Sequence, residues 1–379
     1  MSTPSPLTLI SGRWAVSLRV WVIVALLKSM LYSARRTGKK LSTAKDASPS
    51  MTNSEPVLGE HIHPHSLGVP QSLSRRTLLT GMVAGLGVAL CGSLIKPGEA
   101  SAAGSVVKLP GFSAFSASVK TLKSGQYYLV ESTGLPLHNM MIGITNWQQQ
   151  VPVPQPYSGS NAWKIPVSPK PAANPISSKN NLFRGAIALA ADGVPIFNAL
   201  NNRGEDSYLI GELDKWGGHC GRADDYHYHV APLHLSRTVG ATKPIAYALD
   251  GYPLYGALEP DGSKMKKLDS LNGHIYKGKY HYHGTNTYPY INGGMYGQVT
   301  VKEGQVDPQP MAGPFRSDGQ PLSGAKITDF ARSGDSKFAL TYTFNGGEYL
   351  IDYTATLQSV EMTFTDPTGK QSRETYTRK

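Results

Sequence analysis

Cysteine is almost absent from this sequence of 379 residues, which contains two. One of them, Cys91, lies in an N-terminal leader, so we expect the mature chain to keep Cys220 alone. A single cysteine cannot form an internal disulfide, and this excludes a disulfide-stapled scaffold. Charged residues are also scarce, at 17%, which excludes a disordered polyelectrolyte. Stability must therefore come from core packing or from a bound metal.

The sequence also lacks the signatures of several common nucleotide and hydrolase sites. It contains no phosphate-binding Walker loop, no dinucleotide fingerprint and no Gly-x-Ser-x-Gly nucleophile elbow. Most of the net charge of +11 lies before residue 103, and the remainder shows no basic stripe, so we expect no nucleic-acid partner. Apolar residues outside the leader lack the 3.6-residue spacing of amphipathic helices. The sequence therefore predicts a mainly β fold.

Residues 1–102 have the order of an export leader. Arg75-Arg76 precedes an apolar, glycine-rich run at residues 78–94, and Ala100-Ser101-Ala102 offers a small-residue cleavage site. Paired arginines before such a run resemble a twin-arginine signal peptide, which predicts a periplasmic or secreted protein. The run is short for a stable membrane span, so a membrane anchor is the less favoured alternative. Signals rarely begin so far along a chain, which makes Met51 a candidate for the true start.

The middle of the chain contains the same order of motifs twice. Residues 186–197 and 245–255 each run from an apolar stretch through Asp-Gly-x-Pro to an aliphatic and an aromatic residue. Each stretch is followed by Leu-Asp, then Gly-His, then Tyr-His-Tyr-His. Corresponding positions are 54 to 58 residues apart, as in Asp192 and Asp250, Asp214 and Asp269, His219 and His274, His227 and His281. We therefore interpret residues 103–304 as one domain made of two pseudo-symmetric β-rich copies.

Alternating residues and turn signals predict strands in both copies and in the tail. Tyr-His-Tyr-His has the two-residue period of a strand, which places both tyrosines on one face and both histidines on the other. Residues 151–175 are rich in proline, and we expect an irregular surface loop there. Alternating runs at 338–344 and 360–364, each followed by a turn signal, predict a small C-terminal β-meander module at residues 305–379.

Histidines two residues apart on a strand present two imidazoles on one face, close enough to chelate one ion. In each copy a third histidine follows a glycine earlier in the chain, so each copy offers three nitrogens. An aspartate could add an oxygen ligand, the candidates being Asp214, Asp224, Asp225 and Asp269. A histidine in a Gly-x-Pro-x-His loop could bend toward the cluster. The predicted ligands of this histidine-rich centre are His219, His227, His229, His274, His281, His283 and His138.

All-imidazole ligation favours a divalent metal such as zinc or copper. The six imidazoles could form one binuclear centre or two separate sites, and the sequence leaves both open. Asp192 and Asp250 can be interpreted as general bases or as turn residues, and the glycine after each favours the turn. His234 is expected to be peripheral. Copy symmetry argues against Cys220 as a thiolate ligand, because the second copy has Ile275 at that place.

The two copies resemble the YHYH-domain family of exported bacterial proteins, which is named after Tyr-His-Tyr-His. The resemblance covers residues 126–301 and implies export but no particular activity. Relatives often carry cysteines where this chain has Trp216, Leu271 and His234, so any disulfides of the family are absent here. Besides both Tyr-His-Tyr-His runs, the resemblance rests on Gly134-Leu135-Pro136-Leu137-His138, Asp192-Gly193-Val194-Pro195, Gly217-Gly218-His219, Asp250-Gly251-Tyr252-Pro253-Leu254-Tyr255-Gly256, and Pro289-Tyr290 before Gly293-Gly294.

The leading functional interpretation is an exported metal-binding protein whose histidine-rich centre is built from the two copies. Enzymatic activity is left open. Hydrolysis by a metal-bound hydroxide and copper redox chemistry are the classes that such a centre would suit. The alternative is an envelope module that binds carbohydrate or another surface. In this interpretation the His/Tyr strands have a structural role, and tyrosine rings stack on sugars. The partner is then a small molecule or a polysaccharide, and we expect no stable membrane span in the mature chain.

Overall fold

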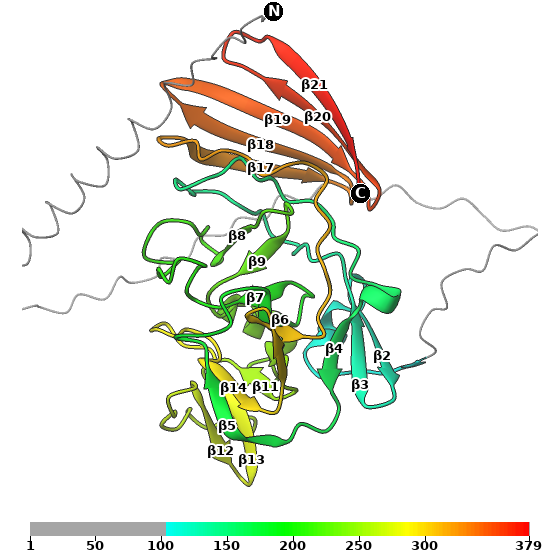
Figure 1. The fold of residues 1–379 in the computed structure, drawn as a ribbon, viewed down its shortest axis with the longest axis vertical. Helices are drawn as coiled ribbons and strands as arrows, with labels where there is room; N and C mark the ends of the chain where they lie inside the picture. Colours follow the sequence, from blue (N-terminus) through cyan, green and yellow to red (C-terminus); the bar gives the residue numbers. More distant parts are fainter. Residues whose placement is uncertain (1–103, 379) are drawn as a thin grey trace, which may run out of the picture. The chain divides into compact units, whose positions relative to one another are not determined.

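The central sheet of the protein is built from eight short strands (Figure 1). The structure is a computed structural model that describes residues 104–378. The expected export signal, its cleavage site and the alternative start at Met51 lie outside these residues. The eight strands are β6 (Ala186–Ala190), β7 (Pro195–Phe197), β8 (Gly218–Cys220), β9 (Tyr226–Tyr228), β10 (Ala246–Ala248), β11 (Pro253–Tyr255), β12 (Gly273–Tyr276) and β13 (Lys279–His283).

The order of strands across this sheet is β12-β13-β11-β10-β6-β7-β9-β8. The same succession of pairings runs outward on either side of the central antiparallel pair β10–β6. Each central strand turns into an antiparallel partner, β7 or β11. β7 pairs in parallel with β9, and β11 pairs in parallel with β13. The outermost strands, β8 and β12, are antiparallel to β9 and β13 and form the two edges of the sheet.

The central strands are buried on both faces, so they carry no polar alternation. All residues of β6 and of β10 are buried, as expected of strands covered on both sides. The turn after β6 requires Gly193, because its φ is 82° and an added Cβ would meet the Ser132 side chain at 2.5 Å. Asp192 closes this turn, since its Oδ1 accepts the Val194 N–H at 3.3 Å.

Smaller sheets and short helices accompany the central sheet. A four-stranded sheet has the order β1-β2-β3-β4, and two two-stranded sheets pair β14 with β5 and β15 with β16. Their bounds are β1 (Ser105–Val106), β2 (Lys120–Ser124), β3 (Tyr127–Glu131), β4 (Trp163–Pro166), β5 (Pro171–Ser177), β14 (Gly294–Gly297), β15 (Thr300–Lys302) and β16 (Gln305–Asp307). The helical elements in the described residues are η1 (Phe112–Phe115), η2 (Gly159–Asn161), η3 (Leu233–Leu235) and α2 (Ser236–Val239).

The prediction of an irregular surface loop at residues 151–175 is wrong for much of this segment. Residues 151–155 are buried, as are Trp163 and Ile165 of β4, and β5 begins within the same stretch. The prolines fit because Pro166 ends β4 and Pro171 begins β5, positions at which a missing N–H does not interrupt a central ladder.

The chain ends in a five-stranded antiparallel meander, drawn in orange to red in Figure 1. Its strands follow one another in order: β17 (Lys326–Ser333), β18 (Lys337–Phe344), β19 (Gly347–Ala355), β20 (Ser359–Thr365) and β21 (Gln371–Thr377). The backbone of Ile327 bonds to Gly143 and Ile144 at 2.9 and 3.1 Å, and the Tyr353 hydroxyl donates to the Pro152 carbonyl at 2.8 Å. These bonds tie the meander to the loop that follows the four-stranded sheet's β3.

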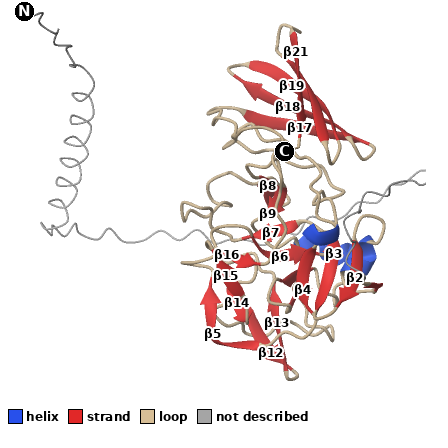
Figure 2. Ribbon diagram, turned by 45° about the vertical axis from the view of Figure 1, so that its right-hand side comes forward, coloured by secondary structure: helices blue, strands red, loops and turns tan. Residues whose placement is uncertain are grey.

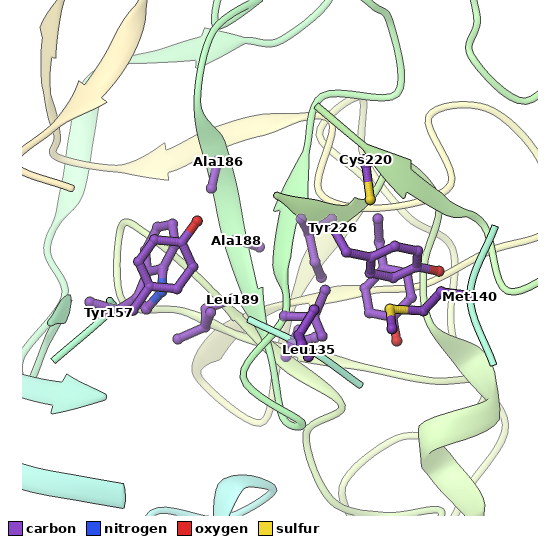
Figure 3. Packing of buried hydrophobic residues seen from close by; sticks show 14 of the residues in the cluster. Leu135, Met140, Tyr157, Ala186, Ala188, Leu189, Cys220 and Tyr226 are labelled. Atoms are coloured by element: carbon purple, nitrogen blue, oxygen red, sulfur yellow. The ribbon is translucent and has the colours of Figure 1, made fainter. Parts of the chain in front are cut away.

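One large hydrophobic cluster joins side chains of the central sheet, the β3–β4 region and the C-terminal meander. Figure 3 shows part of it, with Tyr226, Met140 and Cys220 gathered around the same region of the core. Strands and loops dominate Figure 2, and α2 is the one α-helix of the described residues. The predicted mainly β fold class is therefore confirmed. Among residues 104–378, no helix is long and apolar enough to cross a membrane.

Candidate metal centres

The histidines of the first Tyr-His-Tyr-His run meet a third histidine from the edge strand. His219 of β8 lies directly opposite His227 of β9 in the antiparallel register, and His229 follows β9 by one residue. The Nε2 atom of His229 lies 3.0 Å from that of His219 and 3.1 Å from that of His227. We call these three residues the first triad. Its nitrogens form a group that could hold a metal ion.

Hydrogen bonds on the far side of two rings set the tautomers of the first triad. His229 Nδ1 lies 2.5 Å from the Asn198 carbonyl oxygen, and His227 Nδ1 lies 3.0 Å from the Asp225 carbonyl oxygen. A carbonyl can only accept, so each Nδ1 carries the proton and each Nε2 presents a lone pair. Such outer hydrogen bonds fix the ring orientation of metal-binding histidines in proteins.

The second Tyr-His-Tyr-His run forms an equivalent group at the other edge of the sheet. His274 of β12 faces His281 of β13 in the register. The Nε2 atom of His281 lies 3.1 Å from that of His274 and 3.0 Å from that of His283. His283 Nδ1 lies 2.6 Å from the Gly256 carbonyl oxygen. Nδ1 therefore carries the proton, and Nε2 presents a lone pair. We call His274, His281 and His283 the second triad.

A buried carboxylate completes the second group. Glu259 is fully buried, and its Oε2 lies 3.0 Å from Nε2 of His281 and 3.6 Å from Nε2 of His283. Its Oε1 lies 3.2 Å from Nε2 of His274 and accepts the Lys266 N–H at 2.9 Å. Glu259 and the second triad therefore form a second group that could hold a metal ion.

Burial keeps several of these imidazoles neutral. Burial, followed by the effect of neighbouring imidazoles, lowers the pKa of His229 to about 3 and that of His281 to about 4. Burial, followed by the two other rings of its triad, lowers the pKa of His219 well below its usual value. The neutral ring is the form that binds metal, so these residues need lose no proton on binding at neutral pH.

The tyrosines of the two runs bond to buried aspartates. The hydroxyls of Tyr226 and Tyr228 donate to Asp214 and Asp192 at 2.8 and 2.9 Å. In the second run, the hydroxyls of Tyr280 and Tyr282 donate to Asp269 and Asp250 at 2.9 and 2.6 Å. Asp192 and Asp250 also accept backbone N–H groups two residues ahead, as turn residues do. These aspartates hold the strands that present the histidines.

The six histidines of the two triads form two separate groups, not one centre built from both halves. β8 and β12 lie at opposite edges of the sheet, which separates the triads. None of the aspartates expected to add an oxygen belongs to either group within residues 104–378. Asp214 and Asp269 accept from tyrosines, Asp224 pairs with Arg316, and Asp225 lies behind His227 Nδ1 at 3.4 Å.

His138 lies apart from both groups, although the sequence placed it among the ligands. Its Nε2 lies 2.9 Å from the Tyr228 hydroxyl, and its ring stacks on Trp216 at 4.6 Å. Tyr228 points away from His227 and His229 because neighbouring strand residues face opposite sides. His234 packs against the same Trp216 at 4.8 Å. Cys220, the neighbour of His219, is buried in the core and belongs to neither group of the described residues.

Sequence reasoning missed Glu259, although a signal for it exists. The first of the two matching sequence stretches continues beyond its aromatic residue as Ala199-Leu200-Asn201, and the second continues as Ala257-Leu258-Glu259. The same 58-residue offset that relates Asp192 to Asp250 aligns Asn201 with Glu259. The second stretch therefore has a carboxylate where the first has an amide.

Part of the chain is similar to a known protein family. Residues 162–267 match the family model described as YHYH protein. The chain carries a YHYH domain. The matched YHYH segment contains the first triad and Glu259 and ends before His274. No curated protein and no solved structure is significantly similar to the chain.

Proposed function

We propose that the protein binds two divalent metal ions, one in each triad, with Glu259 as a fourth ligand in the second. The geometry of the first triad carries this proposal. Both Nδ1 protons of His227 and His229 are committed to carbonyl oxygens, so two nitrogen lone pairs face each other at 3.1 Å. Two facing lone pairs repel, and a cation between them turns the repulsion into coordination.

The spacing of the nitrogens also suits an ion. Two ligands of a tetrahedral zinc, each about 2.0–2.1 Å from the metal, lie roughly 3.3 Å apart. Two of the Nε2–Nε2 separations in each triad are 3.0 to 3.1 Å, so small ring movements open these pairs to that size. Imidazole ligands suit zinc and copper, which remain the proposed metals.

Elemental analysis of the purified protein tests this function. We expect two zinc or copper ions per chain, one per chain in His227→Ala, one in His281→Ala, and none in the double variant. His234→Ala serves as the matched control, because this half-buried histidine lies outside both triads, and the variant is expected to keep two ions. Absence of stoichiometric metal from the folded protein, together with no uptake from micromolar zinc, would contradict the proposal.

We also propose the wider organisation that the sequence suggests. Residues 1–102 act as a twin-arginine leader, residues 103–304 form the duplicated domain and residues 305–379 form a C-terminal module, so the mature protein is periplasmic or secreted. The matching pairings on both sides of β10–β6 support the duplication. A leader processed at residue 102 would be detected by N-terminal sequencing of the exported protein. A mature chain that still contains Arg75-Arg76 would contradict it.

A cleft of about 970 Å³ favours a second candidate function, the binding of carbohydrate. Tyrosines line it together with prolines, and such rings stack on sugar faces. The tyrosines are Tyr252, Tyr255, Tyr276, Tyr280 and Tyr296. Calorimetric titration with soluble oligosaccharides in EDTA tests this function. Binding that is lost in Tyr276→Ala and indifferent to metal would support it, and no heat of binding with or without metal would exclude it.

A further inference from the structure

The two candidate centres differ at one structurally equivalent position. Asn201 and Glu259 each begin the same kind of turn, because their N–H groups donate to the carbonyls of Glu205 and Ser263 at 2.8 and 2.9 Å. The carbonyl oxygens of Asn201 and Glu259 in turn each accept a glycine N–H at 2.9 Å, from Gly204 and from Gly262. The two turns thus have the same backbone hydrogen bonds, and they differ in the side chain at their first residue.

The Asn201 side chain does not replace Glu259. Its Oδ1 accepts the Arg203 and Glu205 N–H groups at 2.9 and 3.1 Å. Its Nδ2 donates to Glu205 at 3.1 Å and to Glu212 at 3.4 Å. Groups of its own turn and Glu212 therefore occupy the amide. The first triad has three protein ligands, while the second group has four.

The first triad is also more accessible from a cavity than the second group is. His219, His227 and His229 all line a cavity of about 490 Å³. Of the second group, His281 alone lines the neighbouring tyrosine cleft. Structural zinc sites are closed by four protein ligands, whereas reactive sites keep three and leave one position open. The first triad has the open arrangement and the second group the closed one.

The charge around the first triad favours an anion. Three neutral imidazoles leave the full double charge on a divalent ion, whereas Glu259 neutralises half of it at the second centre. Three guanidinium groups also line the cavity of the first triad, against two carboxylates; these residues are Arg184, Arg203, Arg222, Glu212 and Asp225. Arg203 is paired with Glu205 and Glu212, and Arg222 is paired with Asp318. The uncompensated charge of the bound ion is therefore what would attract an oxyanion into the cavity.

We propose that the first centre keeps an exchangeable fourth coordination position that binds an oxygen of a small anion, a carboxylate or a phosphate. The second centre is closed and holds its ion as a structural element. This inference rests on the metal-binding function proposed above. It assigns the polar cavity, and not the tyrosine cleft, as the ligand site.

Cobalt substitution separates the inference from the function on which it rests. The full-length protein is freed of metal, loaded with two equivalents of Co²⁺, and titrated with acetate and, separately, with inorganic phosphate. Visible absorption reports the coordination of each ion. We expect a saturable change that involves one of the two cobalt ions, and the anion that causes it at lower concentration identifies the ligand class.

Exchanging the distinguishing side chains provides the decisive variants. Asn201→Glu supplies the missing carboxylate, so we expect loss of the anion response and at least tenfold tighter metal binding at the first centre. Glu259→Asn removes the carboxylate of the second centre, so we expect at least tenfold weaker metal binding there. Asn286→Glu is the matched control, because it adds the same charge at an exposed residue that does not line the cavity. Its anion response is expected to persist.

Each result has a distinct meaning. Two bound cobalt ions whose spectrum ignores both anions overturn the inference and leave the metal-binding function intact. An anion response that survives in Asn201→Glu, with the variant folded by circular dichroism, also overturns it. Failure of the protein to take up cobalt, zinc or copper removes the proposed function itself.

Discussion

Asp192 links a turn of the central sheet to the strand that presents the first triad. Its carboxylate accepts the Val194 N–H and the Tyr228 hydroxyl, and only 5% of the residue is exposed. Burial raises the pKa of Asp192 to about 6, against the opposing effect of these hydrogen bonds. The folded protein therefore keeps a proton on Asp192 at a pH where the unfolded chain has lost it.

This shift predicts a pH dependence that Asp192→Asn removes. A raised pKa favours folding below about pH 4, and the contribution fades as the pH rises through about 6. The shift of roughly two units corresponds to about 3 kcal/mol. We expect urea denaturation of the variant, in EDTA, to show a smaller fall in the free energy of unfolding between pH 4 and 7. The exposed Asp329→Asn should leave the fall unchanged, and an identical fall in Asp192→Asn would refute the assignment.

At the scale of elements, each triad depends on a glycine opposite a tyrosine. A Cβ added at Gly218 of β8 would lie 2.5 Å from the Tyr226 hydroxyl and 2.8 Å from the His227 carbonyl oxygen. Gly273 of β12 would meet Tyr280 and the His281 carbonyl oxygen in the same way. The glycine before each edge-strand histidine therefore lets a tyrosine pack across the strand pair.

Gly218→Ala is expected to displace β8 from β9 and to release the first ion. His219 and His227 face each other only while this register holds. Metal analysis of the variant should give one ion per chain, because the second centre, on β12 and β13, serves as an internal control. Retention of two ions would show that the close contact is relieved without moving His219. The reciprocal Gly273→Ala should release the second ion alone.

Strands whose residues alternate along a short segment could be predicted from the sequence. Contacts between residues that are far apart in the sequence could not. Tyr-His-Tyr-His alternates over four residues, so its two faces follow from the strand period. Glu259 stands 22 residues before His281 in a turn, and its approach depends on the parallel pairing of β11 with β13. The separation of the triads depends on which strands become edges, and no local pattern contains that information.

At the scale of the whole molecule, the first triad is joined to the C-terminal segment. Asp224, next to Asp225 that orients His227, accepts two hydrogen bonds of 2.9 Å from the Arg316 guanidinium. Both side chains of this pair are largely buried. Arg316 also donates to the Gln149 carbonyl, in the loop that contacts the meander. These hydrogen bonds connect the first triad to the segment leading to the meander.

Removal of metal should therefore lower the stability of the whole described region. At a free metal concentration a hundredfold above Kd, each ion stabilises the folded state by about 3 kcal/mol. Each kcal/mol moves the Tm of a domain of comparable size by roughly 2–4 °C. We expect EDTA to lower the Tm by at least about 5 °C, measured by scanning calorimetry. The double variant His227→Ala and His281→Ala should be insensitive to EDTA, and a Tm of the wild type that EDTA leaves unchanged would contradict the account.

A crystal structure of the zinc-loaded protein, with anomalous scattering recorded at the zinc edge, tests the central claim most directly. The account predicts two anomalous peaks per chain, each about 2.0–2.1 Å from three Nε2 atoms, with Glu259 as a fourth ligand at the second peak only. Imidazoles that turn apart to bond with neighbouring protein groups, with no anomalous peak at either triad, would contradict it.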